Sequence, residues 1–140
     1  QRGLLVIGET FWRKTPTNEV CEALGIERDF LPHLGELPTI FNNADTDLLE
    51  MMLIDPGAID HHYAQQWRSL STWLYDHETH EDAASVREWL LKSQQLYMRY
   101  EREYLGQGIF ILSAMGQLTE TEEPDEDNLS FDWQTEQPET

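Results

Sequence analysis

The 140-residue sequence contains little cysteine, few positive charges and no long apolar run. One cysteine, Cys21, excludes an internal disulfide and a cysteine-rich zinc module. A reducing cytoplasm is therefore the expected compartment. No apolar run approaches the roughly 20 residues that span a bilayer, and the amino terminus lacks the pattern of a secretory signal.

Positive charge is scarce throughout. Nine Lys and Arg residues stand against 27 acidic residues, giving a net charge of −18. Nucleic acids and anionic membranes are bound through exposed cations, so neither is an expected partner. Residues 117–140 hold nine of the acids and no cation, which predicts a disordered acidic tail. Such a tail usually serves to solubilise a protein, and Leu129, Phe131 and Trp133 within it leave docking to a partner protein as the alternative.

Three short apolar runs predict strands at residues 4–7, 48–54 and 109–112, because each is bounded by glycine or by Asp-Pro-Gly. The run at 48–54 is also compatible with a helix, since Leu, Glu and Met favour that conformation. The length fits one domain, and strands separated by helices predict an α/β layer fold.

Helical periodicity is strongest in the second half of the chain. It predicts helices over 58–80 and 81–103, the second of which ends at Gly106–Gly108. Capping residues predict a shorter helix over 19–24, with Thr17 or Asn18 at its start and Gly25 at its end, and another short helix is expected around 33–43. Aromatic side chains recur on the two long helices and predict a packed seam between them: Trp67, Trp73, Trp89, Tyr97 and Tyr100.

The stretch Gly3–Arg13, with the sequence GLLVIGETFWR, resembles the fifth strand and following loop of class I S-adenosylmethionine-dependent methyltransferases that act on small molecules. Asp60–Tyr63 with Trp67 resembles the segment after their sixth strand. Tyr97–Phe110 is similar to the end of a helical insertion and the seventh strand. The resemblance covers about residues 2–115.

This resemblance implies a partial Rossmann-like sheet, in which 109–115 runs antiparallel between 4–9 and 48–54. It also implies a helical lid at about 58–105 within a domain of residues 1–116. The family's Gly-rich cofactor loop is missing, and the sequence has no initiator methionine. We therefore expect the carboxyl-terminal half of a methyltransferase, a fragment that is inactive and binds no S-adenosylmethionine alone. Its expected partners are the missing amino-terminal half, a small-molecule acceptor and, through uncovered sheet, a second copy.

Two residues are candidates for proton removal during methyl transfer. Glu9 ends the first predicted strand, where ligands gather in open α/β sheets, and His62 opens the first long helix. Structural or surface roles are the alternative for both. Trp12 and Arg13 are candidates for binding the acceptor, with core packing and a solvated surface position as alternatives. The resemblance adds Tyr63 and Trp67 to the acceptor side.

Two further interpretations remain open from the residues. His77 and His80 have the spacing of metal ligands, but a polar hairpin turn explains them without a metal, and no metal site is predicted. The alternative function for the whole chain is a non-catalytic adaptor whose acidic tail docks a basic partner protein.

Overall fold

The computed structural model describes residues 3–115, whose three strands form one sheet in the order β1-β3-β2. The strands are β1 (Leu4–Trp12), β2 (Thr46–Leu53) and β3 (Leu105–Ala114). Because β3 is antiparallel to both neighbours, β1 and β2 are parallel and end at the same edge. The α/β class and the central antiparallel last strand are confirmed. The predicted acidic tail lies outside the described residues.

The register agrees with the predicted strand pairing, but β3 begins earlier than the sequence indicates. Ile7 lies opposite Phe110, and Trp12 lies opposite Leu105. The Gly106–Gly108 segment was expected to end a helix and instead belongs to the strand. Gly106 lies opposite Phe11, and a Cβ there would come within 2.5 Å of the Phe11 ring. The absent side chain is therefore what lets this part of β3 pair.

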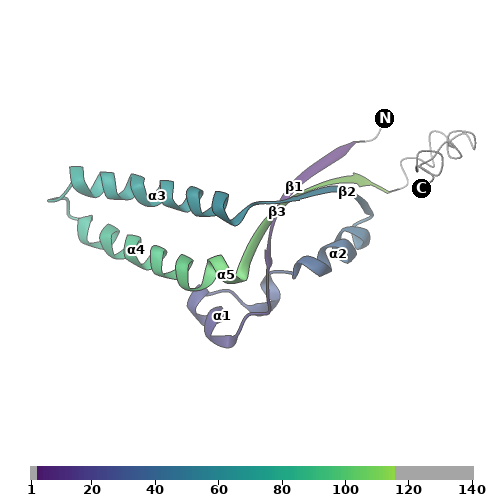
Figure 1. Ribbon diagram of the computed structural model, residues 1–140, viewed down its shortest axis with the longest axis horizontal. Helices are drawn as coiled ribbons and strands as arrows, with labels where there is room; N and C mark the ends of the chain where they lie inside the picture. The colour runs from purple at the N-terminus through teal and green to yellow at the C-terminus, as the bar shows by residue number, and fades with distance from the viewer. Residues whose placement is uncertain (1–2, 116–140) are drawn as a thin grey trace, which may run out of the picture.

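Eight helical segments connect the described strands, and Figure 1 shows their arrangement. Between β1 and β2 lie α1 (Asn18–Leu24), two 3-10 turns (Arg28–Phe30 and Leu34–Glu36) and α2 (Leu37–Asn43). Between β2 and β3 lie α3 (Pro56–Asp76), α4 (Ala83–Leu96), a π-helical turn η3 (Tyr97–Glu101) and the short α5 (Arg102–Tyr104). None of these described helices is long and apolar enough to cross a membrane.

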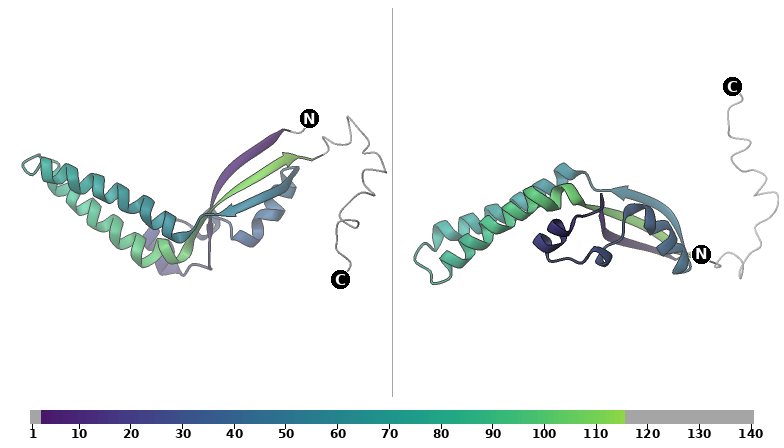
Figure 2. Two further views of the ribbon diagram at one scale, coloured as in Figure 1. Left: turned by 45° about the horizontal axis from the view of Figure 1, so that its top comes forward. Right: turned by 90° about the horizontal axis from the view of Figure 1, so that it is seen from below.

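The core lies on the face of the sheet that α2 covers. It consists of Phe11, Leu37, Phe41, Phe110 and Leu112, with Ile7 and Leu34 packed beside them. The Phe41 and Phe110 rings meet with centroids 5.5 Å apart, which ties the helix to the central strand. Both views in Figure 2 show α2 lying along the sheet.

Several apolar side chains on the opposite face of the sheet are exposed. Side chains alternate between faces along a strand, so Leu4 and Val6 point away from the face of Ile7 and Phe110. They are 65% and 63% exposed, and Met52 on β2 is 60% exposed. Exposed apolar side chains on both edge strands mark a surface suited to pairing or packing with further polypeptide.

The helices α3 and α4 pack side by side and project from the edge of the sheet where β1 and β2 end (Figure 1). Trp67 and Tyr97 meet in the seam with ring centroids 5.7 Å apart, and the Trp67 indole donates to the Ser93 hydroxyl. The predicted aromatic seam is thus found at the end of the helical pair nearer the sheet. Trp89 differs from the prediction, because its side chain is 55% exposed.

Candidate functional site

Two adjoining clefts lie where β1 and β2 end, β3 begins and α3 starts. The first encloses about 190 Å³ and is called here the aromatic cleft, because Tyr63 and Tyr97 line it together with charged side chains. The second encloses about 230 Å³ and is called the apolar cleft. Five lining residues belong to both: Arg13, Pro56, Ile59, Leu105 and Gln107. The carboxyl edge of the parallel strands is where open α/β sheets bind ligands.

The first turn of α3 is fixed by its own sequence. The Asp55 carboxylate accepts a hydrogen bond from the Gly57 amide at 2.7 Å, as expected of an Asp at the helix cap. Pro56 occupies the first turn, where its missing N–H costs nothing. The Ile54 amide donates to the Gln107 carbonyl at 2.9 Å. Helix and strand are therefore joined directly at the clefts.

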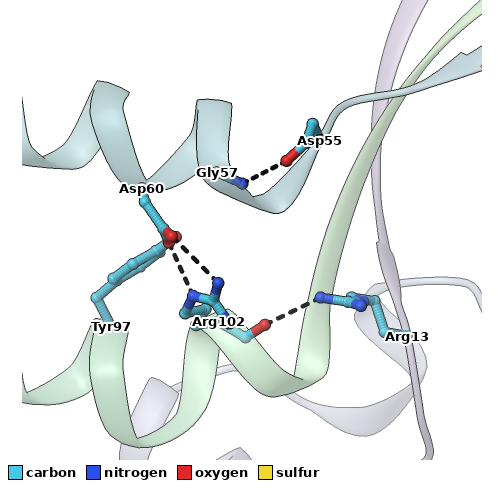
Figure 3. Close-up of polar contacts among 6 residues, drawn as sticks. All are labelled: Arg13, Asp55, Gly57, Asp60, Tyr97 and Arg102. Carbon is cyan, nitrogen blue, oxygen red and sulfur yellow. Dashed lines mark hydrogen bonds and ion pairs between the residues drawn. The ribbon is translucent and has the colours of Figure 1, made fainter.

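Asp60 is the centre of a polar cluster at the base of the helical pair (Figure 3). Arg102 donates to its two carboxylate oxygens at 2.9 and 3.1 Å, and the Tyr97 hydroxyl donates at 2.6 Å. These hydrogen bonds, from Arg102 first and then Tyr97, hold the pKa of Asp60 below its ordinary value. The carboxylate thus joins the start of α3 to one side chain of η3 and one of α5.

The π turn explains how Tyr97 and Arg102 both reach Asp60. Side chains five positions apart in an α-helix point about 140° apart. In η3 the Arg102 amide instead donates to the Tyr97 carbonyl, five residues back, which is the π-helical pattern. The wider turn places both side chains on one side. Single π turns of this kind recur at functional sites.

Tyr63 lines the aromatic cleft and stacks on Tyr97, with ring centroids 4.2 Å apart. Its hydroxyl donates to the Glu101 carboxylate at 2.9 Å. Burial, and then the hydrogen bond to Glu101, raise the pKa of Tyr63 to about 12. Burial and the bond to Asp60 raise the pKa of Tyr97 as well. Both phenols therefore remain protonated donors at neutral pH.

Arg13 follows β1 and lines both clefts. Its backbone amide donates to the Tyr104 carbonyl at 2.7 Å, and Nη1 of its side chain donates to the Arg102 carbonyl at 3.2 Å (Figure 3). The Arg13 side chain is thereby held against the start of β3, with its exposed guanidinium at the cleft mouth.

The other residues singled out from the sequence occupy different surroundings. Trp12 is only 1% exposed, and its indole donates to the Arg28 carbonyl at 2.9 Å. Glu9 lies opposite Gly108 within the sheet, and His62 lies in the first turns of α3 with its ring against Gln66. The Trp67 ring lies beside the Tyr63 ring, with centroids 6.1 Å apart. Of the six predicted residues, only Arg13 and Tyr63 line the two clefts.

Sequence reasoning assigned no site role to several lining residues: Thr10, Pro56, Ile59, Glu101, Leu105 and Gln107. It also missed the ion pair between Asp60 and Arg102, which are 42 positions apart. No local spacing signals such a pair. The resemblance to methyltransferases includes the segments that contain both residues, and this was the one indication in the sequence that they matter.

The strand and helix arrangement matches solved methyltransferases. Two structures are described as S-adenosylmethionine-dependent methyltransferases in complex with S-adenosyl-L-homocysteine, one from Geobacter sulfurreducens and one from Thiobacillus denitrificans. They are 33% and 34% identical to this chain, and each aligns with a TM-score of 0.74 over 80% of it. Residues 3–115 therefore have a class I methyltransferase-like fold.

A curated relative is the uncharacterized protein YjhP of Escherichia coli K12, which is 36% identical over 115 residues. The X-ray structure of YjhP aligns with a TM-score of 0.75. The match covers 80% of this chain but 46% of YjhP, so the chain spans about half the length of the curated relative it matches. No protein-family model matches the chain.

Within residues 3–115 no three His, Cys, Asp or Glu side chains gather where they could hold a metal ion. The two histidines with the spacing of metal ligands, His77 and His80, both contact protein groups. His77 stacks on Trp73 with ring centroids 4.5 Å apart, and His80 accepts from the Asp82 amide at 3.0 Å.

Proposed function

We propose that the chain is the acceptor-binding portion of an S-adenosylmethionine-dependent methyltransferase that acts on a small molecule. The observation that carries this proposal is the pair of clefts at the carboxyl edge of β1 and β2. They lie in a fold shared with two methyltransferases that hold S-adenosyl-L-homocysteine, which is the cofactor without its methyl group. Clefts with apolar walls and a few polar side chains are typical of small-molecule sites.

The cofactor itself is bound elsewhere in the proposed enzyme. A nucleotide-like cofactor is usually held by a Gly-rich turn between a strand and a helix. The junction between β2 and α3 has Asp-Pro-Gly there, and the Asp55 carboxylate already occupies the Gly57 amide. The junction after β1 is Arg-Lys-Thr-Pro. Neither junction suits a cofactor, so we infer that polypeptide outside residues 3–115 supplies its site.

The open side of the sheet supports the same division of labour. Leu4 and Val6 expose more than half of their surface on an edge strand. Burying such apolar surface is favourable by about 25 cal/mol per Å². We infer that the cofactor-binding half packs against this strand, and that a second copy can do so in its absence.

Methyl transfer is an in-line displacement, so the protein mainly aligns the acceptor and removes a proton where the acceptor carries one. Tyr63 and Arg13 would align the acceptor, and α3 with α4 would cover it as a lid. Glu9 and His62 remain predicted proton acceptors. Each directly precedes a residue that lines the aromatic cleft, Thr10 and Tyr63 respectively.

A chimera tests the proposal. The matched region of the Geobacter sulfurreducens methyltransferase is replaced by residues 3–115 of this chain. We expect the chimera to bind S-adenosyl-L-homocysteine in calorimetry and to transfer labelled methyl groups to small molecules of a bacterial extract. The 140-residue chain alone is expected to give no binding heat.

Two tyrosines on α3 provide matched variants. Tyr63 lines the aromatic cleft, whereas Tyr75 is 80% exposed. Tyr63→Ala should lower methyl transfer by the chimera at least tenfold while S-adenosyl-L-homocysteine still binds, and Tyr75→Ala should leave transfer unchanged. Equal transfer by both variants would place the acceptor elsewhere. A chimera that binds the cofactor product but methylates nothing would favour the adaptor function.

A further inference from the structure

Gly106 leaves room for the side chain of Arg13. A Cβ at Gly106 would lie 2.9 Å from Cγ of Arg13, which is closer than such atoms approach. The aliphatic part of Arg13 therefore rests on the bare backbone of β3. Together with the hydrogen bond from Nη1 to the Arg102 carbonyl, this contact directs the guanidinium along the edge of the sheet.

Arg13 is also a cation without a carboxylate partner in the described part of the chain. Its two cationic neighbours are both neutralised, Arg102 by Asp60 and Lys14 by Glu103. A guanidinium carries five N–H donors, and the protein bond described above uses one of them.

The apolar cleft gives this cation a specific setting. Its walls include Phe11, Leu53, Ile59 and Leu105, and Arg13 is the one charged residue among the described residues that line it. The Glu101 carboxylate lies on the other side, in the aromatic cleft, where Tyr63 holds it. The cleft encloses about 230 Å³.

From this combination we infer that the apolar cleft binds a small amphipathic carboxylate, with the carboxylate on the Arg13 guanidinium and the apolar body between β2, α3 and β3. The planar guanidinium offers two parallel donors to the two carboxylate oxygens. The cation repels amines, and neutral molecules of the same shape bind more weakly because they lack the contact with the guanidinium. The inference rests on the proposed function, since it specifies the chemical class of the acceptor.

The test uses the 140-residue chain and three probes with the same six-carbon body. Hexanoate, hexanol and hexylammonium are titrated at neutral pH and fixed ionic strength while amide signals of Ile59 and Leu105 are followed by NMR. We expect saturable shifts with hexanoate, binding at least tenfold weaker with hexanol, and no saturable shifts with hexylammonium. Equal affinity for hexanoate and hexanol would overturn the inference.

Substitutions of two arginines separate a local effect from a change in net charge. Arg13→Gln should weaken hexanoate binding at least tenfold, and Arg13→Lys should restore only part of it because the second parallel donor is missing. Arg87→Gln on α4 removes the same charge outside both clefts and should leave binding unchanged. Thermal melting establishes that the variants fold. Equal binding by Arg13→Gln and Arg87→Gln would refute the inference.

The two sets of experiments distinguish failure of this inference from failure of the proposed function. A chimera that methylates only uncharged acceptors, with no hexanoate binding by the chain, would refute the carboxylate site and leave the methyltransferase. Binding of hexanoate through Arg13, together with a chimera that transfers no methyl group, would establish the site and refute the enzyme.

Discussion

Replacing Gly106 by alanine should destabilise the fold, and the structure indicates by how much. A Cβ at this position would lie 2.5 and 2.6 Å from two atoms of the Phe11 ring. Phe11 is 3% exposed and belongs to the core, so it cannot swing into solvent without losing its packing. Overpacking of this kind costs about 1–3 kcal/mol. We expect Gly106→Ala to lower the free energy of unfolding by about 1–3 kcal/mol.

Urea unfolding followed by tryptophan fluorescence measures this change, since Trp12 is buried beside the site. Gly8→Ala is the matched control, because the nearest atom to its added Cβ would be the Gly108 carbonyl oxygen at 3.9 Å. This variant should stay within about 0.5 kcal/mol of the original chain. Phe11→Leu combined with Gly106→Ala should cost less than the sum of the two single changes, because the residues touch. Equal stability of the two alanine variants would refute the packing argument.

Three further predictions concern the polar cluster and the sheet edge. The folded-state pKa of Tyr63, about 12, exceeds the ordinary value of about 10. The contribution of Tyr63 to stability is therefore complete below pH ~10 and lost as the pH rises through about 12. Tyrosinate absorbance should show this late ionisation, and Tyr63→Phe should remove it. Arg102 lowers the pKa of Asp60. The contribution of Asp60 to stability is therefore present above pH ~4 and lost as the pH falls below that value. Asp60→Asn should make stability less dependent on pH below pH ~4. Val6→Lys should reduce self-association of the chain in sedimentation velocity, because Val6 lies exposed on an edge strand, and equal association of the two proteins would contradict a sheet-edge contact.

The sequence was most informative where the pattern is local. Apolar runs bounded by glycine or proline placed all three described strands, and Thr17 and Gly25 marked the ends of α1. The start of β3 was missed because Gly-Gln-Gly reads as a break in a helix. Its strand conformation depends on β1 lying opposite and on Phe11 filling the space above Gly106.

The candidate site was predicted only in part for a similar reason. Arg13 and Tyr63, which were predicted from recognisable motifs, line the clefts. The cluster of Asp60 with Tyr97 and Arg102 depends on one extra residue in a helical turn, which no 3.6-residue pattern reveals. Trp12 was expected at the acceptor, but its indole is held by the Arg28 carbonyl, a contact between segments 16 positions apart.

The sequence by itself determined the α/β class, the sites of the strands and long helices, and the excess of negative charge, because these follow from local periodicity and composition. Only the tertiary structure decided which side chains meet at the carboxyl edge of the sheet. Residues from β1, α3, η3 and β3 converge there through strand register and one π turn. Such meetings depend on long-range packing, which adjacent residues do not encode.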